Sequence, residues 1–135
     1  MALASSARTG GAPRIAFVTM GCAKNEVDTD AMRRRLAAAG YDVDAAPEQA
    51  DAVVVNTCSF IQAATEESLE AVFDAVSLPQ MEAGKGAVIV AGCMPARYGV
   101  ELEAELGEAS AFVPCADEER IVEVVRRCVG PAGAG

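Results

Sequence analysis

The sequence predicts an α/β domain built on a doubly wound parallel sheet, and three observations support this. Short apolar runs alternate along the chain with stretches of helical periodicity, as in folds whose parallel strands are joined by helices. The runs at 52–55 and 87–91 are continuously apolar, which indicates strands covered on both faces. The composition is 52% hydrophobic but only 4% aromatic, which suits an interior made of Ala, Val, Ile and Leu.

Five strands are expected, and their order decides which strand ends are neighbours. They cover residues 14–19, 41–44, 52–56, 87–91 and 111–113. Right-handed crossovers favour the flavodoxin-like order 2-1-3-4-5, with helices on both faces of the sheet. The first, third and fourth strands would then be adjacent, each about 4.8 Å from the next. The order 1-2-3-4-5 would instead separate the first strand from the third. The link between the second and third strands is unusually short for a crossover.

Helices are expected over residues 26–39, 61–76, about 100–106 and 118–127. The apolar face of the first helix is predicted to consist of Val27, Met32, Leu36 and Ala39. Gly40 follows in the position where helices commonly end, and Asp117 is expected to cap the last helix. The run Arg33-Arg34-Arg35 is interpreted as a solvated helix face, with a docking patch as the alternative.

The length and net charge of the chain limit the classes of function that we expect for it. The chain of 135 residues predicts one domain over 14–129, preceded by a flexible leader over 1–13 and followed by the start of a linker over 130–135. With 20 acidic and 11 basic residues the net charge is −9, so direct binding of nucleic acid by this acidic domain is not expected. The sequence contains no secretory signal and no membrane-length apolar run, so we expect a cytoplasmic protein without a membrane partner.

Three cysteines carry the strongest chemical signal. Cys22, Cys58 and Cys93 each follow a predicted strand, at the edge where α/β sheets bind ligands. Helix amino ends at such turns favour the thiolate, which is the form that binds metal. Gly21 and Gly92 precede two of these cysteines and would let the backbone approach a bulky group. The chain has no histidine, which removes the commonest metal ligand and every Cys-His nucleophile.

Several interpretations of these thiols remain open from the residues alone. Three cysteines are one ligand short of a structural zinc site, but they suit an iron–sulfur cluster with one open iron. The cysteines could instead be small packed side chains, or a thiol redox protein could pair them. A flavodoxin-like interaction or receiver domain with incidental cysteines is a further class. It is disfavoured because no acidic cluster follows the first strand and no phosphate-binding loop is present.

Other residues near the same edge have less specific interpretations. Cys115 follows the fifth strand and is interpreted as a partly buried thiol, with a role that the sequence does not determine. Cys128 lies four residues after Val124 on the last predicted helix, which indicates core packing. The polar residues of this edge have two interpretations, as turn and helix caps or as hydrogen-bond donors to cluster sulfurs. They are Asn25, Asp28, Asn56 and Thr57.

The segments around the three cysteines resemble a known family. They read Gly-Cys-Ala-Lys-Asn-Glu-Val-Asp at 21–28, Asn-Thr-Cys-Ser-Phe-Ile at 56–61 and Gly-Cys at 92–93. Together they resemble the amino-terminal domain of the radical-SAM methylthiotransferases. Lys24 and the pair Phe60-Ile61 favour the branch that modifies ribosomal protein S12. The tRNA-adenosine branch, which tends to have Gln-Met-Asn after the first cysteine, is the alternative.

The resemblance implies a function for the three thiols. Cys22, Cys58 and Cys93 would hold an auxiliary [4Fe-4S] cluster, and the full-length enzyme would use it to supply sulfur for methylthiolation of an aspartate of ribosomal protein S12. A second [4Fe-4S] cluster and S-adenosylmethionine would belong to a following domain. The Cys-x-x-x-Cys-x-x-Cys motif of that domain is absent from this chain. We therefore expect no catalytic residue in this fragment and no turnover by it alone.

Overall fold

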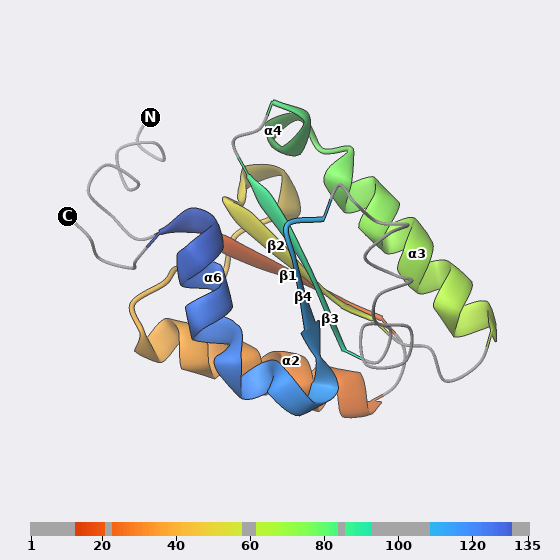
Figure 1. Ribbon diagram of the computed structural model, residues 1–135, viewed down its shortest axis with the longest axis horizontal. Helices are drawn as coiled ribbons and strands as arrows, with labels where there is room; N and C mark the ends of the chain where they lie inside the picture. Colours follow the sequence, from red (N-terminus) through yellow and green to blue (C-terminus); the bar gives the residue numbers. More distant parts are fainter. Residues whose placement is uncertain (1–12, 21–22, 58–61, 84–85, 93–108, 131–135) are drawn as a thin grey trace.

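The computed structural model describes residues 13–20, 23–57, 62–83, 86–92 and 109–130. A parallel sheet runs through the middle of the molecule, with helices on either side (Figure 1). Its four strands are β1 (Ile15–Thr19), β2 (Ala52–Thr57), β3 (Ala87–Gly92) and β4 (Ala111–Pro114). They lie in the order β1-β2-β3-β4, and all three pairings are parallel. The predicted α/β class with a parallel sheet is confirmed.

The prediction of five strands in the order 2-1-3-4-5 is wrong. Residues 41–44 form no strand, and among the described residues their only β-pairing is a single parallel bridge between Arg14 and Asp42. The backbone N–H of Ile15 donates to the carbonyl of Asp42 at 2.7 Å. The Asp42 carboxylate then accepts from the backbone N–H of Asp44 at 3.1 Å, a local turn that competes with strand pairing. The described sheet therefore has four strands, with β1, β2 and β3 adjacent.

Helices cover both faces of the sheet, as predicted. One face carries α2 (Ala23–Ala38) and α6 (Ile121–Val129), and the other carries α3 (Gln62–Val76) and the short α4 (Pro79–Glu82) (Figure 1). Two 3₁₀ turns, η1 (Pro47–Gln49) and η2 (Cys115–Arg120), complete the described elements. The helix expected around 100–106 lies outside the described residues. Within the described part of the chain, no helix has both the length and the apolar character to cross a membrane.

The core has two halves because successive strand residues point to opposite faces of the sheet. Toward α2 and α6, Val54 and Ile89 pack with Met32 and Leu36 of α2. Toward α3, a second cluster contains four strand valines and Val72 of the helix; the strand valines are Val53, Val55, Val88 and Val90. This double coverage explains why the strands are continuously apolar.

The buried face of α2 differs from the predicted one. Val27 is 67% exposed, and Ala39 is exposed just beyond the end of the helix. The buried positions are instead Asn25, Thr29, Met32 and Leu36, spaced by four, three and four residues. The carboxyl half of α2 therefore contributes apolar side chains to the core, whereas its amino half contributes polar ones.

The ends of the helices test two further predictions. Gly40 has a φ of 103°, its N–H donates to Ala37, and the N–H of Tyr41 donates to Leu36, each at 3.0 Å. This pattern confirms the predicted glycine helix end. The prediction that Asp117 caps the last helix is wrong, because residues 115–120 form η2 and α6 begins at Ile121 with no side-chain cap.

Candidate functional site

The carboxyl ends of the adjacent strands β1, β2 and β3 lie in register. Thr19 of β1 pairs with Asn56 of β2, and Asn56 pairs with Ala91 of β3. One position further along, Thr57 pairs with Gly92, and the N–H of Met20 donates to the carbonyl of Asn56 at 2.9 Å. The three strand segments therefore reach the same edge of the sheet at the same level.

The cysteines predicted as ligands lie just beyond these strand ends and outside the described residues. Each follows a described strand-end residue by one or two positions: Cys22 follows Met20, Cys58 follows Thr57, and Cys93 follows Gly92. Their convergence therefore stays a prediction. Among the described residues, no group of three or more Cys, Asp or Glu side chains is placed to hold a metal ion.

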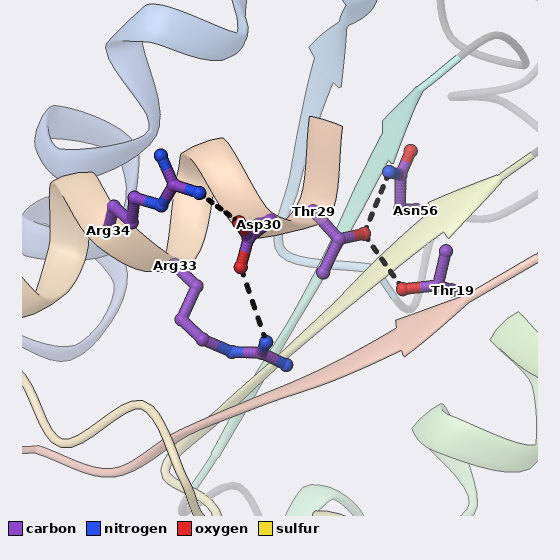
Figure 2. Close-up of polar contacts among 6 residues, drawn as sticks. All are labelled: Thr19, Thr29, Asp30, Arg33, Arg34 and Asn56. Carbon is purple, nitrogen blue, oxygen red and sulfur yellow. Dashed lines mark hydrogen bonds and ion pairs between the residues drawn. The ribbon is translucent and has the colours of Figure 1, made fainter. Parts of the chain in front are cut away.

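A buried polar network lies at this edge, between β2 and α2. Asn56 is fully buried, and its side-chain amide donates to the carbonyl of Asn25 at 2.8 Å and to Thr29 Oγ1 at 2.9 Å. The hydroxyls of Thr29 and Thr19 form a further hydrogen bond of 2.8 Å, so the network reaches β1 (Figure 2). Both N–H groups of Asn56 are thus used within the protein. This corrects the hypotheses that Asn56 caps a helix or donates to a cluster sulfur.

Asn25, on α2, adds further hydrogen bonds between this helix and β2. Its side-chain amide donates to the carbonyl of Thr57 at 2.8 Å and lies 3.4 Å from Asn56 Oδ1. The Thr57 hydroxyl donates to the carbonyl of Ala91 on β3. Asn25 and Thr57 are 3% and 0% exposed, so these hydrogen bonds are shielded from water. The network therefore joins α2 to all three strands.

Gly92 ends β3 and pairs with Thr57 of β2 at this edge. Its φ is +97°, a conformation that L side chains rarely adopt. A Cβ at this position would lie 2.5 Å from Asn56 Oδ1 and 2.5 Å from the carbonyl oxygen of Thr57. The sequence suggested that this glycine makes room for a bulky bound group. The structure gives a reason within the protein itself, because Asn56 and Thr57 occupy the space that a side chain would need.

The arginine run on α2 is largely a solvated face, as interpreted from the sequence. Arg34 and Arg35 are exposed, and Arg34 pairs with Asp30 at 2.5 Å. Arg33 also faces Asp30, at 3.9 Å (Figure 2). Its guanidinium lies over the ring of Phe17, 5.4 Å from the centroid, so this arginine interacts with the sheet.

The two remaining cysteines occupy different settings. Cys128 on α6 is free and packs partly buried against the core, which confirms its prediction; burial raises the pKa of its thiol. Cys115 begins η2 directly after Pro114, which pairs with Gly92. Cys115 therefore follows the end of β4, the neighbour of β3, at the same edge of the sheet as the residues that precede Cys58 and Cys93. The prediction that Cys115 follows a strand is confirmed.

Thr29 and Thr19 belong to the network but were missed as site residues. A polar side chain inside a helix ordinarily suggests a solvent-facing position. The missed signal is spacing, because Thr29 lies four residues after Asn25 and three before Met32 and therefore shares their face.

Comparison with known proteins places the chain in a family. Residues 14–114 match the family described as "Uncharacterized protein family UPF0004". Three curated relatives are each named "Ribosomal protein uS12 methylthiotransferase RimO". The one from Trichodesmium erythraeum is 49% identical over 115 residues, which is 85% of this chain and 25% of the relative. The one from Gloeothece citriformis is 47% identical over 118 residues, 87% of this chain and 26% of the relative. The one from Symbiobacterium thermophilum is 45% identical over 120 residues, 88% of this chain and 24% of the relative.

The chain thus spans about a quarter of the length of these relatives. Their names agree with the resemblance drawn from the three cysteine segments. That resemblance, to the amino-terminal domain of a methylthiotransferase most like the one for ribosomal protein S12, is confirmed. Since the family match covers most of the chain, the protein belongs to the family UPF0004.

Proposed function

We propose that this chain is the cluster-binding amino-terminal domain of a uS12 methylthiotransferase. One observation carries the proposal: the residues that precede Cys58 and Cys93 pair in register, and the segment that precedes Cys22 is hydrogen-bonded beside them. Adjacent parallel strands lie about 4.8 Å apart, a spacing that a cluster held by three cysteines can bridge. The names of the relatives support the reaction class.

The chemistry of the donor set fits an iron–sulfur cluster. Cys22, Cys58 and Cys93 would hold a [4Fe-4S] cluster through three thiolates and leave one iron without a protein ligand. Structural zinc normally takes four protein ligands, and the chain has no histidine to complete such a set. When bound, the cluster would supply an iron at which sulfur can be held for transfer. At the strand ends that precede these cysteines, Asn56 and Thr57 are fully buried and hydrogen-bonded within the protein.

The remaining parts of the reaction belong to the longer enzyme. We propose that the full-length protein, a transferase of the radical-SAM class, methylthiolates an aspartate of ribosomal protein S12 in the cytoplasm. A second [4Fe-4S] cluster and S-adenosylmethionine would bind outside this chain, so this fragment alone is expected to be inactive. Because this domain carries a net charge of −9, binding of nucleic acid would fall to other parts of the enzyme.

Anaerobic reconstitution with iron and sulfide tests the cluster. We expect a brown protein with about four irons per chain. Substitution of any one of Cys22, Cys58 or Cys93 by Ser should reduce iron binding sharply. Cys128→Ser and Cys115→Ser are matched controls that remove a thiol outside the proposed ligand set and should retain the cluster. A colourless wild-type chain, or full iron loading when all three proposed ligands are Ser, contradicts the proposal. Loss of iron in Cys115→Ser would show that the ligand set is wrong.

Mass spectrometry of the products tests the substrate. The full-length enzyme, given S-adenosylmethionine, sulfide and a one-electron reductant, should add one methylthio group to ribosomal protein S12, and the Cys58→Ser variant should not. Methylthiolation of a tRNA adenosine, with S12 unchanged, would assign the protein to the other branch of the family.

A further inference from the structure

We infer that Asn56 is a positioning residue that sets the relative placement of the three segments carrying Cys22, Cys58 and Cys93. The inference rests on the proposed function and deepens it. Its basis is that one buried side chain is hydrogen-bonded to α2, which follows Cys22, and lies beside Gly92, which precedes Cys93. Asn56 itself lies two residues before Cys58, and the other contacts involve α2 and Gly92.

The segment around Cys22 is connected to Asn56 from both sides. After the cysteine, Asn56 Nδ2 donates to the carbonyl of Asn25 and to Thr29 Oγ1, at 2.8 and 2.9 Å. Before the cysteine, the Thr19 hydroxyl is bonded to Thr29 Oγ1 at 2.8 Å (Figure 2). The short connection that contains Cys22 therefore begins and ends on residues held by the same network.

The end of β3, which precedes Cys93, lies beside the side-chain oxygen of Asn56. A Cβ on Gly92 would lie 2.5 Å from Asn56 Oδ1, so only glycine allows β3 to come this close. The side-chain N–H groups of Asn56 thus bind α2, whereas its side-chain oxygen limits how closely the end of β3 can approach β2. A different side chain at position 56 would change both distances together.

Hydrogen bonds suit this role better than apolar contacts would. Apolar packing tolerates small sliding movements, whereas a buried amide without its partners carries a large penalty. Asn56 is 0% exposed, so water does not replace a lost partner there. The network therefore favours one arrangement of α2 against β2, and a cluster held by three thiolates requires such a fixed arrangement.

Four variants of this chain separate positioning from general stability. Thr29→Val keeps the shape of the side chain but removes the acceptor for Asn56, and Thr29→Ser restores the hydroxyl. Asn56→Asp keeps the shape but removes both N–H donors. Ile15→Val is the matched control, because it weakens the core at the amino end of β1, far from the network.

The readout is binding of Co²⁺ by the anaerobic apo chain, followed through its thiolate charge-transfer absorption, with far-UV circular dichroism to verify folding. We expect Thr29→Val and Asn56→Asp to weaken Co²⁺ binding by about ten- to a hundredfold, the usual effect of losing a residue that supports metal ligands. Their absorption bands should also change in intensity. Thr29→Ser and Ile15→Val should bind as the wild type does, although Ile15→Val unfolds at lower urea.

The outcomes distinguish this inference from the proposed function. If the wild-type chain binds neither iron nor Co²⁺, the proposed function fails and this inference fails with it. If the wild type binds but Thr29→Val shows unchanged affinity and spectrum, the network only stabilises the fold and the inference is wrong. Since Thr29→Val introduces no charge, it decides the question even if Asn56→Asp does not fold.

Discussion

Replacement of Gly92 by alanine is the sharpest test of how the strand edge is built. Two effects add at this position. Holding a non-glycine residue at a φ of +97° costs about 1–3 kcal/mol. A Cβ only 2.5 Å from the carbonyl oxygen of Thr57 forces the two strands apart, at a cost of about 1–3 kcal/mol for overpacking. We therefore expect Gly92→Ala to lower the free energy of unfolding by about 2–6 kcal/mol, a large part of the stability of a small domain.

Gly130 offers a matched control for this substitution. Its φ of +94° is nearly the same, but a Cβ there would meet nothing within 4 Å. Gly130→Ala therefore carries the backbone strain without the steric contact. The difference between the two variants measures how closely β3 approaches β2, and we expect it to be about 1–3 kcal/mol.

Urea unfolding of the apo chain provides the measurement. Far-UV circular dichroism is the suitable signal because the chain has no tryptophan and only two tyrosines. The slope of the transition should stay the same in both variants, since the surface exposed on unfolding hardly changes. Equal losses of stability in Gly92→Ala and Gly130→Ala would refute the reasoning. Iron loading that Gly92→Val leaves unchanged would also show that this glycine has no role at the proposed cluster site.

Three further predictions concern other parts of the structure. Tyr41→Phe removes the hydrogen bond of 2.8 Å from the tyrosine hydroxyl to the carbonyl of Gly130 and should cost about 0.5–1.5 kcal/mol in thermal or urea unfolding. Burial raises the pKa of the Cys128 thiol above its usual 9.0. At a given pH, iodoacetamide should therefore alkylate this thiol more slowly in the folded chain than in urea, when the other cysteines are Ser. The corresponding stability is present below pH 9.0 and lost as the pH rises through the folded-state pKa. Asp30→Asn breaks the exposed ion pairs with Arg33 and Arg34 and should change stability by less than about 0.5 kcal/mol, with the difference vanishing in high salt.

Sequence periodicity located the strands well but described α2 poorly. The apolar runs 15–18, 52–55 and 87–91 lie within β1, β2 and β3, and strands with such runs have few alternatives. On α2 the apolar residue Val27 was assigned to the core and is exposed, whereas Asn25 and Thr29 are buried. Hydrophobicity indicates burial only on average. A polar side chain is buried when tertiary partners satisfy its hydrogen bonds, and those partners lie on β1 and β2.

The missing fifth strand has a similar cause. Residues 41–44 alternate apolar and acidic side chains, as a half-buried strand does, but only Asp42 forms a bridge, with Arg14. The chain needs to return to β2 within a few residues, and the carboxylate of Asp42 bonds to the backbone of Asp44 in that return. Local turn chemistry therefore limits the strand to one bridge.

The sequence by itself determined the α/β class, the approximate strand positions and the three cysteine segments, because these depend on local composition and chain order. Only the tertiary structure decided the number of strands in the described sheet, the identity of the buried face of α2 and the hydrogen-bond partners of Asn56. These depend on which groups meet across the sheet, and the hydrogen bonds of a buried amide are satisfied by partners distant in sequence.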